Sequence, residues 1–471
     1  MDSLALVPHV AIFPFPAQGH VNSMLKLAQL LSLSSFRITF LVTIDTYDRL
    51  LNNTDVMSRF SSGLFHLQPL PHGISMDNVS TRDGISILYY SLNAIAKPFL
   101  REFIADSSVT CIIADGILSM AYDVAEEINL PIIYFRTASP CSFWSYFCVP
   151  ELIQAGELPL KENAMDLTLT KVKGMEDFLR GRDLPSFCRA SDISSPDIRI
   201  VMMETRQTPR ARGLIFNTFE DLDGPILSQI RTVCPNVYTI GPVHAHLKVR
   251  LATKSTSSNS LWQEDECCMS WLDTQPSKSV IYVSFGSIAG VTREELLEFW
   301  YGLVNSEQKF LWVMRPDLIV GQERKDEIPV ELEQGTKARG YITDWVPQEK
   351  VLAHTAIGGF LTHSGWNSTL ESIVEGVPMI CWPRFADQQV NSRYVGEVWK
   401  MGLDMKDTCD RDIIAKSIKD LMEKTMGEFL ERTEHMASLA RRAVDEGGSS
   451  YINLDRLIQD IASMVLPLKQ T

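Results

Sequence analysis

The fold is best read from the stretch Ile357-Gly-Gly-Phe-Leu-Thr-His-Ser-Gly-Trp-Asn-Ser-Thr-Leu-Glu371. Its first part, 357–362, is a short apolar run typical of a buried strand, and the segment that begins at Asn367 has the pattern of a helix. A strand that turns directly into a helix is the repeating unit of a doubly wound α/β sheet. Free backbone N–H groups at the start of such a helix can bind an anion. The stretch therefore predicts an α/β fold and a place for a charged ligand.

The same alternation of strand and helix occurs in two separate parts of the chain. Apolar runs at 10–15 and 38–42 flank a segment, Met24 to Leu31, whose apolar residues follow a helical period. The pattern restarts after Ser279, with a helix expected over about 293–304. The strands expected are 10–15, 38–42, 109–114, 131–135, 280–285, 310–314 and 357–362.

A chain of 471 residues exceeds the size at which one core usually keeps growing, so two domains are expected. We predict an N-terminal domain over 1–245, a linker over 246–262 and a second domain over 263–450. The linker is assigned from the polar run Leu251-Ala-Thr-Lys-Ser-Thr-Ser-Ser-Asn-Ser260. A last amphipathic helix within 451–471 is expected to pack back on the N-terminal domain.

Composition excludes several classes of protein. Acidic residues outnumber basic ones 58 to 44, and no dense basic stripe is present, so nucleic acid is not an expected partner. The nine cysteines lack paired spacing, which favours reduced thiols and a cytoplasmic location. The N-terminus lacks the basic region of a signal peptide, and no apolar run reaches about 18 residues, so neither a leader nor a membrane span is expected.

A candidate ligand site follows from strand ends that lead into helices. His363, Asn367 and Ser368 lie where a diphosphate would meet a helix N-terminus, and the turn at Ser287 follows the first strand of the same domain. Each feature also has a purely structural interpretation. Ser368-x-x-Glu371 fits a capping box, in which both side chains only satisfy backbone amides. Trp345 and Trp366 fit core aromatics, and Asp387-Gln388 fits an ordinary helix start.

The combination of motifs is more informative than any single residue. Trp345-Val-Pro-Gln348, Thr362-His-Ser-Gly-Trp-Asn-Ser-Thr-Leu-Glu371 and Trp382-Pro-Arg-Phe-Ala-Asp-Gln388 stand in order within one window. This window resembles the signature box of the plant family-1 UDP-sugar-dependent glycosyltransferases that act on small molecules. The resemblance also covers the rest of the chain, including Gly19-His20, Asp115 and Val283-Ser-Phe-Gly-Ser287. It implies a GT-B type α/β fold, in which two doubly wound Rossmann-like domains face each other across a cleft.

The resemblance also implies a role for each residue of the donor site. Trp345 would stack on uracil, Gln348 would contact the base or ribose, and Glu371 would accept hydrogen bonds from the ribose hydroxyls. The diphosphate would be held by His363, Asn367, Ser368 and Ser287. The sugar would be contacted by Trp366, Asp387 and Gln388. A final Gln in the box resembles the glucose-preferring members, so UDP-glucose is the expected co-substrate.

His20 and Asp115 are the expected reacting pair. Each residue stands at the carboxyl end of an expected strand, so both would open on the same crevice although they are far apart in sequence. A histidine can take the proton of an attacking hydroxyl at neutral pH, and a carboxylate can orient it. Taken alone, His20 also fits a helix-start histidine and Asp115 an N-cap. The resemblance places the catalytic His and Asp at these positions, although Ser23 replaces a frequent proline and Ser364 a frequent cysteine.

No DxD-like acidic pair with suitable flanking elements is found, so no metal or other cofactor is expected. Charge on the leaving group would be met by a helix N-terminus and hydrogen bonds. The resemblance then implies a single displacement with inversion, which converts UDP-glucose into a β-glucoside or a glucose ester. A monomer that binds UDP-glucose and a small lipophilic acceptor is expected.

The acceptor is less constrained by the sequence. Candidate lining residues are the aromatic run 143–147, a loop around 85–90, Thr137 and Ser139, although Trp144 and Phe147 equally fit plain helix core. The segment Gly181-Arg-Asp-Leu-Pro-Ser-Phe187 resembles the branch that glucosylates terpenoids, iridoids and cyanohydrins. A terpenoid or iridoid acceptor is therefore expected ahead of a flavonoid or other phenol.

Three other classes of function remain open at this level. A UDP-sugar epimerase would share the donor site, and a UDP-sugar-binding module without turnover would share it too. A dehydrogenase would need a Gly-x-Gly-x-x-Gly turn, which follows none of the expected strands.

Overall fold

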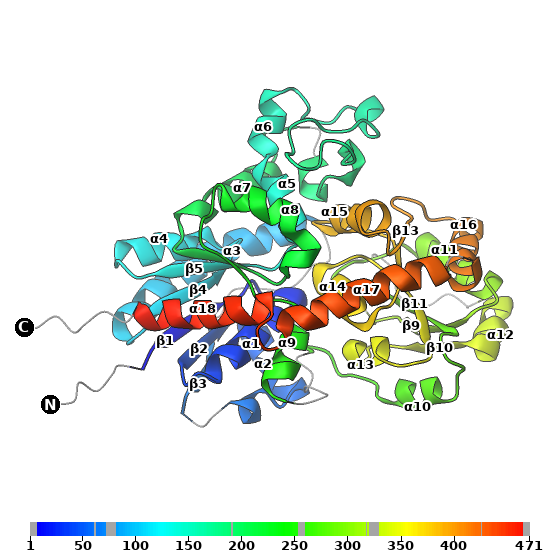
Figure 1. Cartoon of the computed structure of the whole chain (residues 1–471), viewed down its shortest axis with the longest axis horizontal. Helices are drawn as coiled ribbons and strands as arrows, with labels where there is room; N and C mark the ends of the chain where they lie inside the picture. The colour runs from blue at the N-terminus through cyan, green and yellow to red at the C-terminus, as the bar shows by residue number, and fades with distance from the viewer. Residues whose placement is uncertain are drawn as a thin grey trace, which may run out of the picture.

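The computed structural model describes residues 7–60, 63–71, 82–189, 192–252, 260–316, 318–319, 329–424 and 426–464. Its strands form two separate parallel sheets, each covered by helices, as Figure 1 shows with the N-terminal half in blue to green and the C-terminal half in yellow to orange. The two sheets confirm the predicted α/β class. The last helices, drawn in red, lie across both halves (Figure 1).

The N-terminal half contains the first sheet. Its elements are β1 (His9–Phe13), α1 (Gln18–Ser32), β2 (Arg37–Val42), α2 (Ile44–Asn53), β3 (Phe65–Pro69), α3 (Arg82–Asp106), β4 (Cys111–Asp115), α4 (Ser119–Glu127), β5 (Ile132–Arg136), α5 (Pro140–Phe147), α6 (Val149–Gln154), α7 (Pro196–Arg206), β6 (Gly213–Phe216), α8 (Glu220–Arg231), β7 (Val237–Thr239) and α9 (Val243–Arg250). The seven strands pair in parallel in the order β3-β2-β1-β4-β5-β6-β7.

The C-terminal half repeats the arrangement with six strands. Its elements are α10 (Cys267–Asp273), β8 (Val280–Ser284), α11 (Arg293–Asn305), β9 (Lys309–Val313), α12 (Val330–Arg339), β10 (Gly340–Thr343), α13 (Gln348–Leu352), β11 (Ile357–Thr362), α14 (Trp366–Glu375), β12 (Met379–Cys381), α15 (Gln388–Arg393), β13 (Gly402–Asp404), α16 (Arg411–Lys419), α17 (Met426–Val444) and α18 (Ser449–Ser463). The sheet order is β10-β9-β8-β11-β12-β13.

The sequence accounts for the parallel sheets through burial on both faces. β1, β4, β5, β8 and β11 are buried along their whole length, which requires the near-continuous apolar runs seen in the sequence. In each sheet the strand order reverses beside the first strand, between β1 and β4 in one half and between β8 and β11 in the other. Ligands bind beyond the carboxyl ends of strands at such a reversal. His20 and Asp115 lie at the first reversal, and Ser287 and His363 at the second.

Three features of the fold differ from the expectations. The helix α9 extends to Arg250, so the predicted linker over 246–262 begins inside a helix that packs on α1, and its residues 253–259 lie outside the described part. The segment expected as a loop around 85–90 belongs to the long helix α3. The helix α17 was not expected from the sequence, because alternating charges mask its narrow apolar stripe of alanines.

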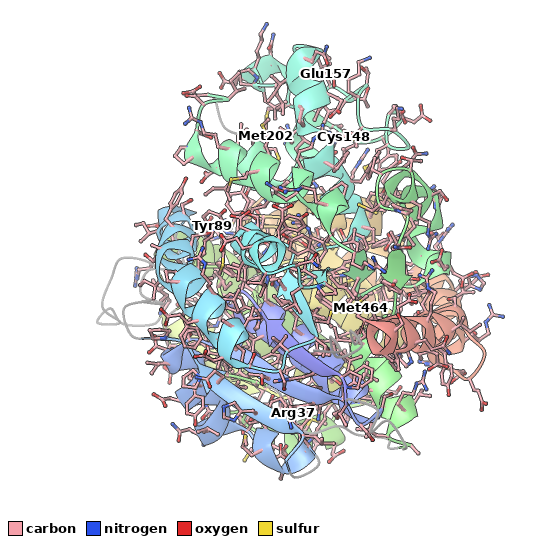
Figure 2. All side chains as sticks on the ribbon, turned by 90° about the vertical axis from the view of Figure 1, so that its left-hand side faces the viewer. Arg37, Tyr89, Cys148, Glu157, Met202 and Met464 are labelled. Carbon is pink, nitrogen blue, oxygen red and sulfur yellow. The ribbon has the colours of Figure 1, made fainter. Side chains whose placement is uncertain are left out.

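The chain returns to its N-terminal half through α18. Tyr238 of β7 donates a hydrogen bond to Asp460 at 2.6 Å, and Asn453 donates to Thr239 at 2.9 Å. Met464 follows α18 and is buried in the N-terminal core, on the side that faces the viewer in Figure 2. Residues 465–471 of the predicted C-terminal segment lie outside the described part.

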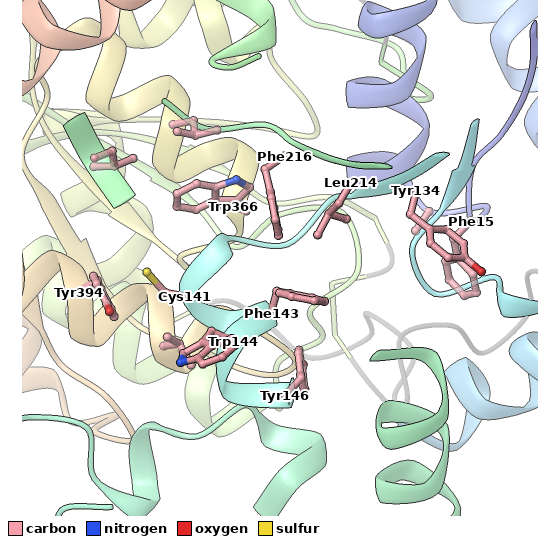
Figure 3. Packing of buried hydrophobic residues seen from close by; sticks show 14 of the residues in the cluster. Phe15, Tyr134, Cys141, Phe143, Trp144, Tyr146, Leu214, Phe216, Trp366 and Tyr394 are labelled. Atoms are coloured by element: carbon pink, nitrogen blue, oxygen red, sulfur yellow. The ribbon is translucent and has the colours of Figure 1, made fainter. Parts of the chain in front are cut away.

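One apolar cluster continues from the N-terminal half into the C-terminal half. It includes Phe143 and Phe216 from the first half and Trp366 from the second, and Figure 3 shows the Trp366 indole beside Phe216. Burial of aromatic surface of this kind stabilises the contact between the halves. The two halves are therefore joined by a packed apolar interface.

Candidate active site

A cavity of about 680 Å³ lies between the two halves and is lined by residues from both. Every residue predicted to react or to bind the donor contributes to this lining. These residues are His20, Asp115, Ser287, Trp345, Gln348, His363, Trp366, Asn367, Ser368, Glu371, Asp387 and Gln388. The cavity wall is largely apolar elsewhere, with polar groups gathered at a few points, as in sites that bind small organic molecules.

The first of these polar points is the His20–Asp115 pair. Nδ1 of His20 lies 2.6 Å from Oδ2 of Asp115, which also accepts a hydrogen bond from the amide of Phe15 at 3.2 Å. Asp115 is fully buried, whereas the His20 side chain is 27% exposed. The arrangement directs Nε2 of His20 away from the carboxylate, so this nitrogen is the one able to take a proton from a bound hydroxyl.

Of the two structural alternatives, the N-cap role of Asp115 is wrong, and the helix-start position of His20 describes only part of its role. The N-cap of α4 is Leu118, so Asp115 does not cap that helix. His20 lies within the first turn of α1, which begins at Gln18, so it is a helix-start histidine that also contacts Asp115. Ser23, where a proline is frequent in the family, donates a hydrogen bond back to the carbonyl of Gly19 at 2.8 Å and leaves the helical turn intact.

Thr137 is an additional contact of the His20 ring. Its Oγ1 lies 2.9 Å from Nδ1 of His20, and it follows directly after β5, the strand next to β4. The sequence suggested Thr137 only as an acceptor-lining residue. Its position one residue beyond a strand neighbouring Asp115 was the available signal, since carboxyl ends of adjacent parallel strands meet at one edge.

The turn after β8 packs against His363. Gly286 has φ +75°, and a Cβ atom there would lie 2.4 Å from Nε2 of His363, as would one on Gly365. Arg315 donates to the carbonyls of Gly286 and Ala289 at 2.7 and 2.8 Å, which fixes the turn that carries Ser287. Burial, followed by the charge of Arg315, lowers the pKa of His363 to about 4. His363 is therefore neutral at pH 7 and can donate one N–H to a ligand.

The first turn of α14 presents backbone amides to the cavity. Its N-cap is Gly365 and no side chain caps it, so the amides of Trp366, Asn367 and Ser368 have no acceptor inside the helix. The capping-box interpretation of Ser368 and Glu371 is wrong, because Ser368 already lies within the helix. A helix start of this kind favours an anionic ligand.

Ser368 and Glu371 instead belong to a side-chain network around Gln348. Gln348 Nε2 donates to Glu371 Oε2 at 2.6 Å and to Ser368 Oγ at 3.0 Å, and its Oε1 accepts from Tyr282 at 3.1 Å. Burial, and next the charge of Glu349, raises the pKa of Glu371. Trp345 also lines the cavity and is stacked with Trp262 at a centroid distance of 5.9 Å.

Two predicted ligand contacts are occupied by the N-terminal half. Trp366 is buried, and its Nε1 donates to the carbonyl of Asn217 at 2.8 Å. Asn367 Nδ2 donates to the carbonyl of Gly19 at 2.8 Å. The indole N–H of Trp366 and the side-chain N–H of Asn367 therefore hold the two halves together. Both residues also line the cavity, so their roles as ligand contacts stay predictions.

Asp387 and Gln388 lie at the start of α15. Asp387 Oδ2 accepts from Asn391 at 3.0 Å, and burial raises the pKa of its carboxyl group. Gln388 Oε1 accepts from the amides of Arg384 and Phe385 at 2.8 and 3.0 Å. These bonds fix the Gln388 amide so that, among the described residues, its Nε2 has no acceptor and remains a donor for a ligand.

Lys26 and Glu349 form an ion pair across the cavity that the sequence did not suggest. Lys26 Nζ of α1 lies 2.6 Å from Glu349 Oε1, and Lys248 approaches the second oxygen at 3.1 Å. The pair stands next to Glu371, whose pKa responds to both partners. Only the relative placement of the two halves creates this contact.

Comparison with known proteins agrees with this geometry. Residues 227–428 match the family model described as "UDP-glucoronosyl and UDP-glucosyl transferase". The chain is 56% identical to 7-deoxyloganetic acid glucosyltransferase of Catharanthus roseus over 475 residues, 98% of each chain. The chain belongs to this family. It is a UDP-sugar-dependent glycosyltransferase, which confirms the resemblance stated from the sequence.

Other relatives place the transferase in the same family. It is 44% identical over 466 residues to myricetin 3-O-rhamnoside 1,2-glucosyltransferase of Crocosmia x crocosmiiflora, covering 98% of this chain and 97% of that one. The structure of Os79 from O. sativa in complex with UDP matches with a TM-score of 0.81 at 26% identity, covering 96% of this chain and 100% of that one. The GT-B expectation is thereby confirmed.

The part of the cavity away from the predicted donor residues is lined by the N-terminal half of the transferase. Phe143 and Tyr146 of α5 line it, whereas Trp144 donates to the carbonyl of Lys173 and stacks on Phe147 in the core. The core interpretation of Trp144 and Phe147 therefore holds. Tyr89 of α3, labelled in Figure 2, also lines the cavity and hydrogen-bonds to the buried Glu204.

Two further features bear on cofactors and membranes. Within the described ranges, no group of three or more His, Cys, Asp or Glu residues is arranged to hold a metal ion. None of the helices in the described part of the chain combines the length and apolar character that crossing a bilayer requires.

Proposed function

We propose that the transferase moves glucose from UDP-glucose to a hydroxyl or carboxyl group of a small lipophilic plant metabolite, with inversion at the anomeric carbon. The observation that carries the proposal is that the His20–Asp115 pair and the predicted donor residues line one cavity. Family membership supports the UDP-sugar as donor. The N-terminal half, 1–245, would bind the acceptor, and the C-terminal half, 263–450, would bind the donor.

The donor would lie along the C-terminal half. Trp345 would take one face of the uracil ring, and Gln348 and Glu371 would bind the ribose, since a carboxylate can accept from two vicinal hydroxyls. The diphosphate would meet the first-turn amides of α14, His363 and Ser287. Glucose would contact Asp387 and the free Nε2 of Gln388, beside the buried Trp366.

His20 would act as the general base. Its Nε2 takes the acceptor proton while the acceptor oxygen forms a bond to the anomeric carbon, and the bond from that carbon to the diphosphate breaks, releasing UDP. Asp115 would stabilise the imidazolium formed in this step. Displacement from the opposite face converts the α-linked donor into a β-product.

We infer that the leaving diphosphate needs no metal ion, because amides at a helix start and a neutral histidine can stabilise its charge. Activity that survives dialysis against EDTA would support this inference, and loss restored by magnesium would contradict it. Residues of one chain supply both the His20–Asp115 pair and the donor residues of the cavity, which supports a monomer as the active form. None of its nine cysteines takes part in a disulfide bond, which supports a reducing compartment such as the cytoplasm.

An iridoid or related terpenoid is the proposed acceptor class. The 56% identical relative from Catharanthus roseus is named for 7-deoxyloganetic acid, and relatives from Gardenia jasminoides and Catharanthus roseus, 39% and 37% identical, are named for 7-deoxyloganetin. The apolar wall formed by Phe143 and Tyr146 suits such a molecule. A phenolic acceptor is the second candidate, because the Crocosmia relative is named for a myricetin glycoside.

A panel assay tests the proposal. The purified protein is incubated with UDP-glucose and iridoids, monoterpene alcohols, flavonoids or no acceptor, and UDP release is measured together with product mass. Acceptor-dependent UDP release with a matching glucoside, largest for an iridoid, is the expected result. UDP release without a glucoside, or none with any acceptor, would overturn the proposed transfer.

A further inference from the structure

Arg136 is a buried cation in the acceptor half of the cavity. It is the last residue of β5, at the same edge of the sheet as Asp115, and it lines the cavity while only 5% exposed. Burying a guanidinium costs free energy unless its N–H groups and its charge find partners. The partners of Arg136 therefore indicate what the site is built to hold.

The guanidinium of Arg136 is only partly satisfied. Its Nη2 donates to the carbonyl of Glu204 at 2.7 Å and to Oγ1 of Thr208 at 2.9 Å. Nε is buried without an acceptor, and Nη1 makes no hydrogen bond to any described residue. The ring of Phe143 lies 5.0 Å from the guanidinium carbon. Nε lies beside Gly116, so Nη1 is the group that keeps hydrogen-bond capacity on a cation lining a largely apolar cavity.

Gly116 supplies the space for this side chain. A Cβ atom at Gly116 would lie 2.4 Å from both Cδ and Nε of Arg136. Glycine directly after Asp115 thus lets the arginine stem lie flat against the backbone. The position of the guanidinium therefore depends on the absence of a side chain at Gly116.

No carboxylate within the described ranges forms an ion pair with Arg136. The carboxyl group of Glu204 is held by Tyr89 and by the amide and hydroxyl of Ser119, both at 2.7 Å. Asp115 is committed to His20. Burial raises the pKa of Glu204 to about 7, which further reduces the negative charge near the guanidinium.

We propose that Arg136 binds a carboxylate of the acceptor, so that the acceptor is a hydroxy acid whose hydroxyl group receives the glucose. The inference rests on the proposed function and narrows its acceptor class. A carboxylate supplies the negative charge and the acceptor lone pairs with which the guanidinium of Arg136 can pair. Hydrogen bonds between charged groups of this kind are stronger than those between neutral groups.

The hydroxyl is assigned as the attacking group because the base is needed only there. A carboxylate is already ionised at neutral pH, so it would transfer no proton to His20. A hydroxyl gives its proton to Nε2 of His20, its oxygen forms the bond to the anomeric carbon, and UDP leaves with the electrons of the broken bond. The product is then an O-glucoside that keeps a free carboxylate.

The wild-type protein gives the first test. Kinetics are measured with 7-deoxyloganetic acid and with its methyl ester, which keeps the hydroxyl and removes the charge. We expect the acid to have the higher kcat/KM by about tenfold or more, mainly through KM. The product from the acid should resist mild alkali, which would hydrolyse a glucose ester. An equal or better ester, or an alkali-labile product, would overturn the inference.

Variants test whether the preference for the acid over the ester depends on Arg136. Arg136→Gln should lower the acid-to-ester ratio of kcat/KM by about tenfold or more, and Arg136→Lys should retain part of it. Arg210→Gln is the matched control, because Arg210 is an exposed cation paired with Glu126 outside the cavity. It should leave the ratio as in the wild type. A role of Arg136 limited to anchoring α7 would reduce turnover of acid and ester alike, and that result would contradict the inference.

Failure of the inference is distinguishable from failure of the proposed function. If neither acid nor ester yields a glucoside while another acceptor of the panel does, the transferase activity stands and the hydroxy-acid acceptor is rejected. If no acceptor is glucosylated, the proposed function itself fails. Should Arg136→Gln not fold, the wild-type comparison of acid and ester still decides.

Discussion

Nδ1 of His20 lies 2.6 Å from Oδ2 of Asp115, although 95 residues separate them in the chain. The contact exists because β1 and β4 are neighbours in the sheet and their carboxyl ends open on the same crevice. The carboxylate can fix the tautomer of the ring and stabilise its protonated form. The order of the strands therefore brings the base and its orienting group together. Each of the two residues can be tested separately.

Asp115→Asn keeps the shape of the orienting group and removes its charge. We expect kcat to fall about 10²- to 10⁴-fold, because the imidazolium formed during transfer loses its counter-charge. The dissociation constant for UDP-glucose should stay within error by calorimetry. Thr137→Val, which removes the neutral contact to the same nitrogen, should cost less. Equal losses in the two variants would contradict the role given to Asp115.

Glu371→Ala tests the ribose contact. We expect donor binding to weaken by about 1–3 kcal/mol, because a buried carboxylate that accepts from ribose hydroxyls is lost. Calorimetry with UDP-glucose measures this, and a melting curve serves as the control. Unchanged donor affinity with a lower melting temperature would show that Glu371 serves only the network with Gln348.

Glu204→Gln tests a pH effect on stability. Burial raises the pKa of Glu204 from an ordinary 4.5 to about 7, so the folded state holds a proton that the unfolded state releases in this interval. The free energy of unfolding contributed by this group therefore falls as pH rises from about 4.5 to about 7. The variant should show a shallower dependence in denaturant titrations across this range. Parallel pH profiles for variant and wild type would refute the assigned ionisation.

Trp366→Phe tests the contact between the halves. The change removes the N–H that pairs with the Asn217 carbonyl and should lower the free energy of unfolding by about 1–3 kcal/mol beyond the loss of ring volume. Trp399→Phe is the matched control, because its Nε1 is buried without a partner among the described residues. Denaturant titration should show the larger loss for Trp366. Equal losses would mean that the hydrogen bond adds nothing measurable.

Much of the fold and site followed from local patterns in the sequence. Apolar runs predicted seven of the thirteen strands in the described residues, and the position of a polar residue at a strand end singled out His20, Asp115 and His363. Such residues are predictable because parallel topology fixes where strand ends meet. The family resemblance added the donor-side assignments, and the structure places those residues around one cavity.

The parts that sequence could not supply depend on how the halves meet. Trp366 and Asn367 are predicted ligand contacts, and the structure adds that a side-chain N–H group of each binds a carbonyl across the interface. The Lys26–Glu349 pair arises in the same way. Arg136 also stands at the end of a strand, where ligand-binding residues are expected. A single arginine after an apolar run, however, fits a surface residue equally well. Only its burial and unfilled hydrogen bonds reveal a site.

His20→Ala tests the central claim most directly. Donor affinity is measured by calorimetry with UDP-glucose, and glucoside formation is measured by mass spectrometry on the same preparation. We expect the affinity to match the wild type while glucoside formation falls by about 10² or more, because only the general base is lost. Near-normal glucoside formation in this variant would contradict the account.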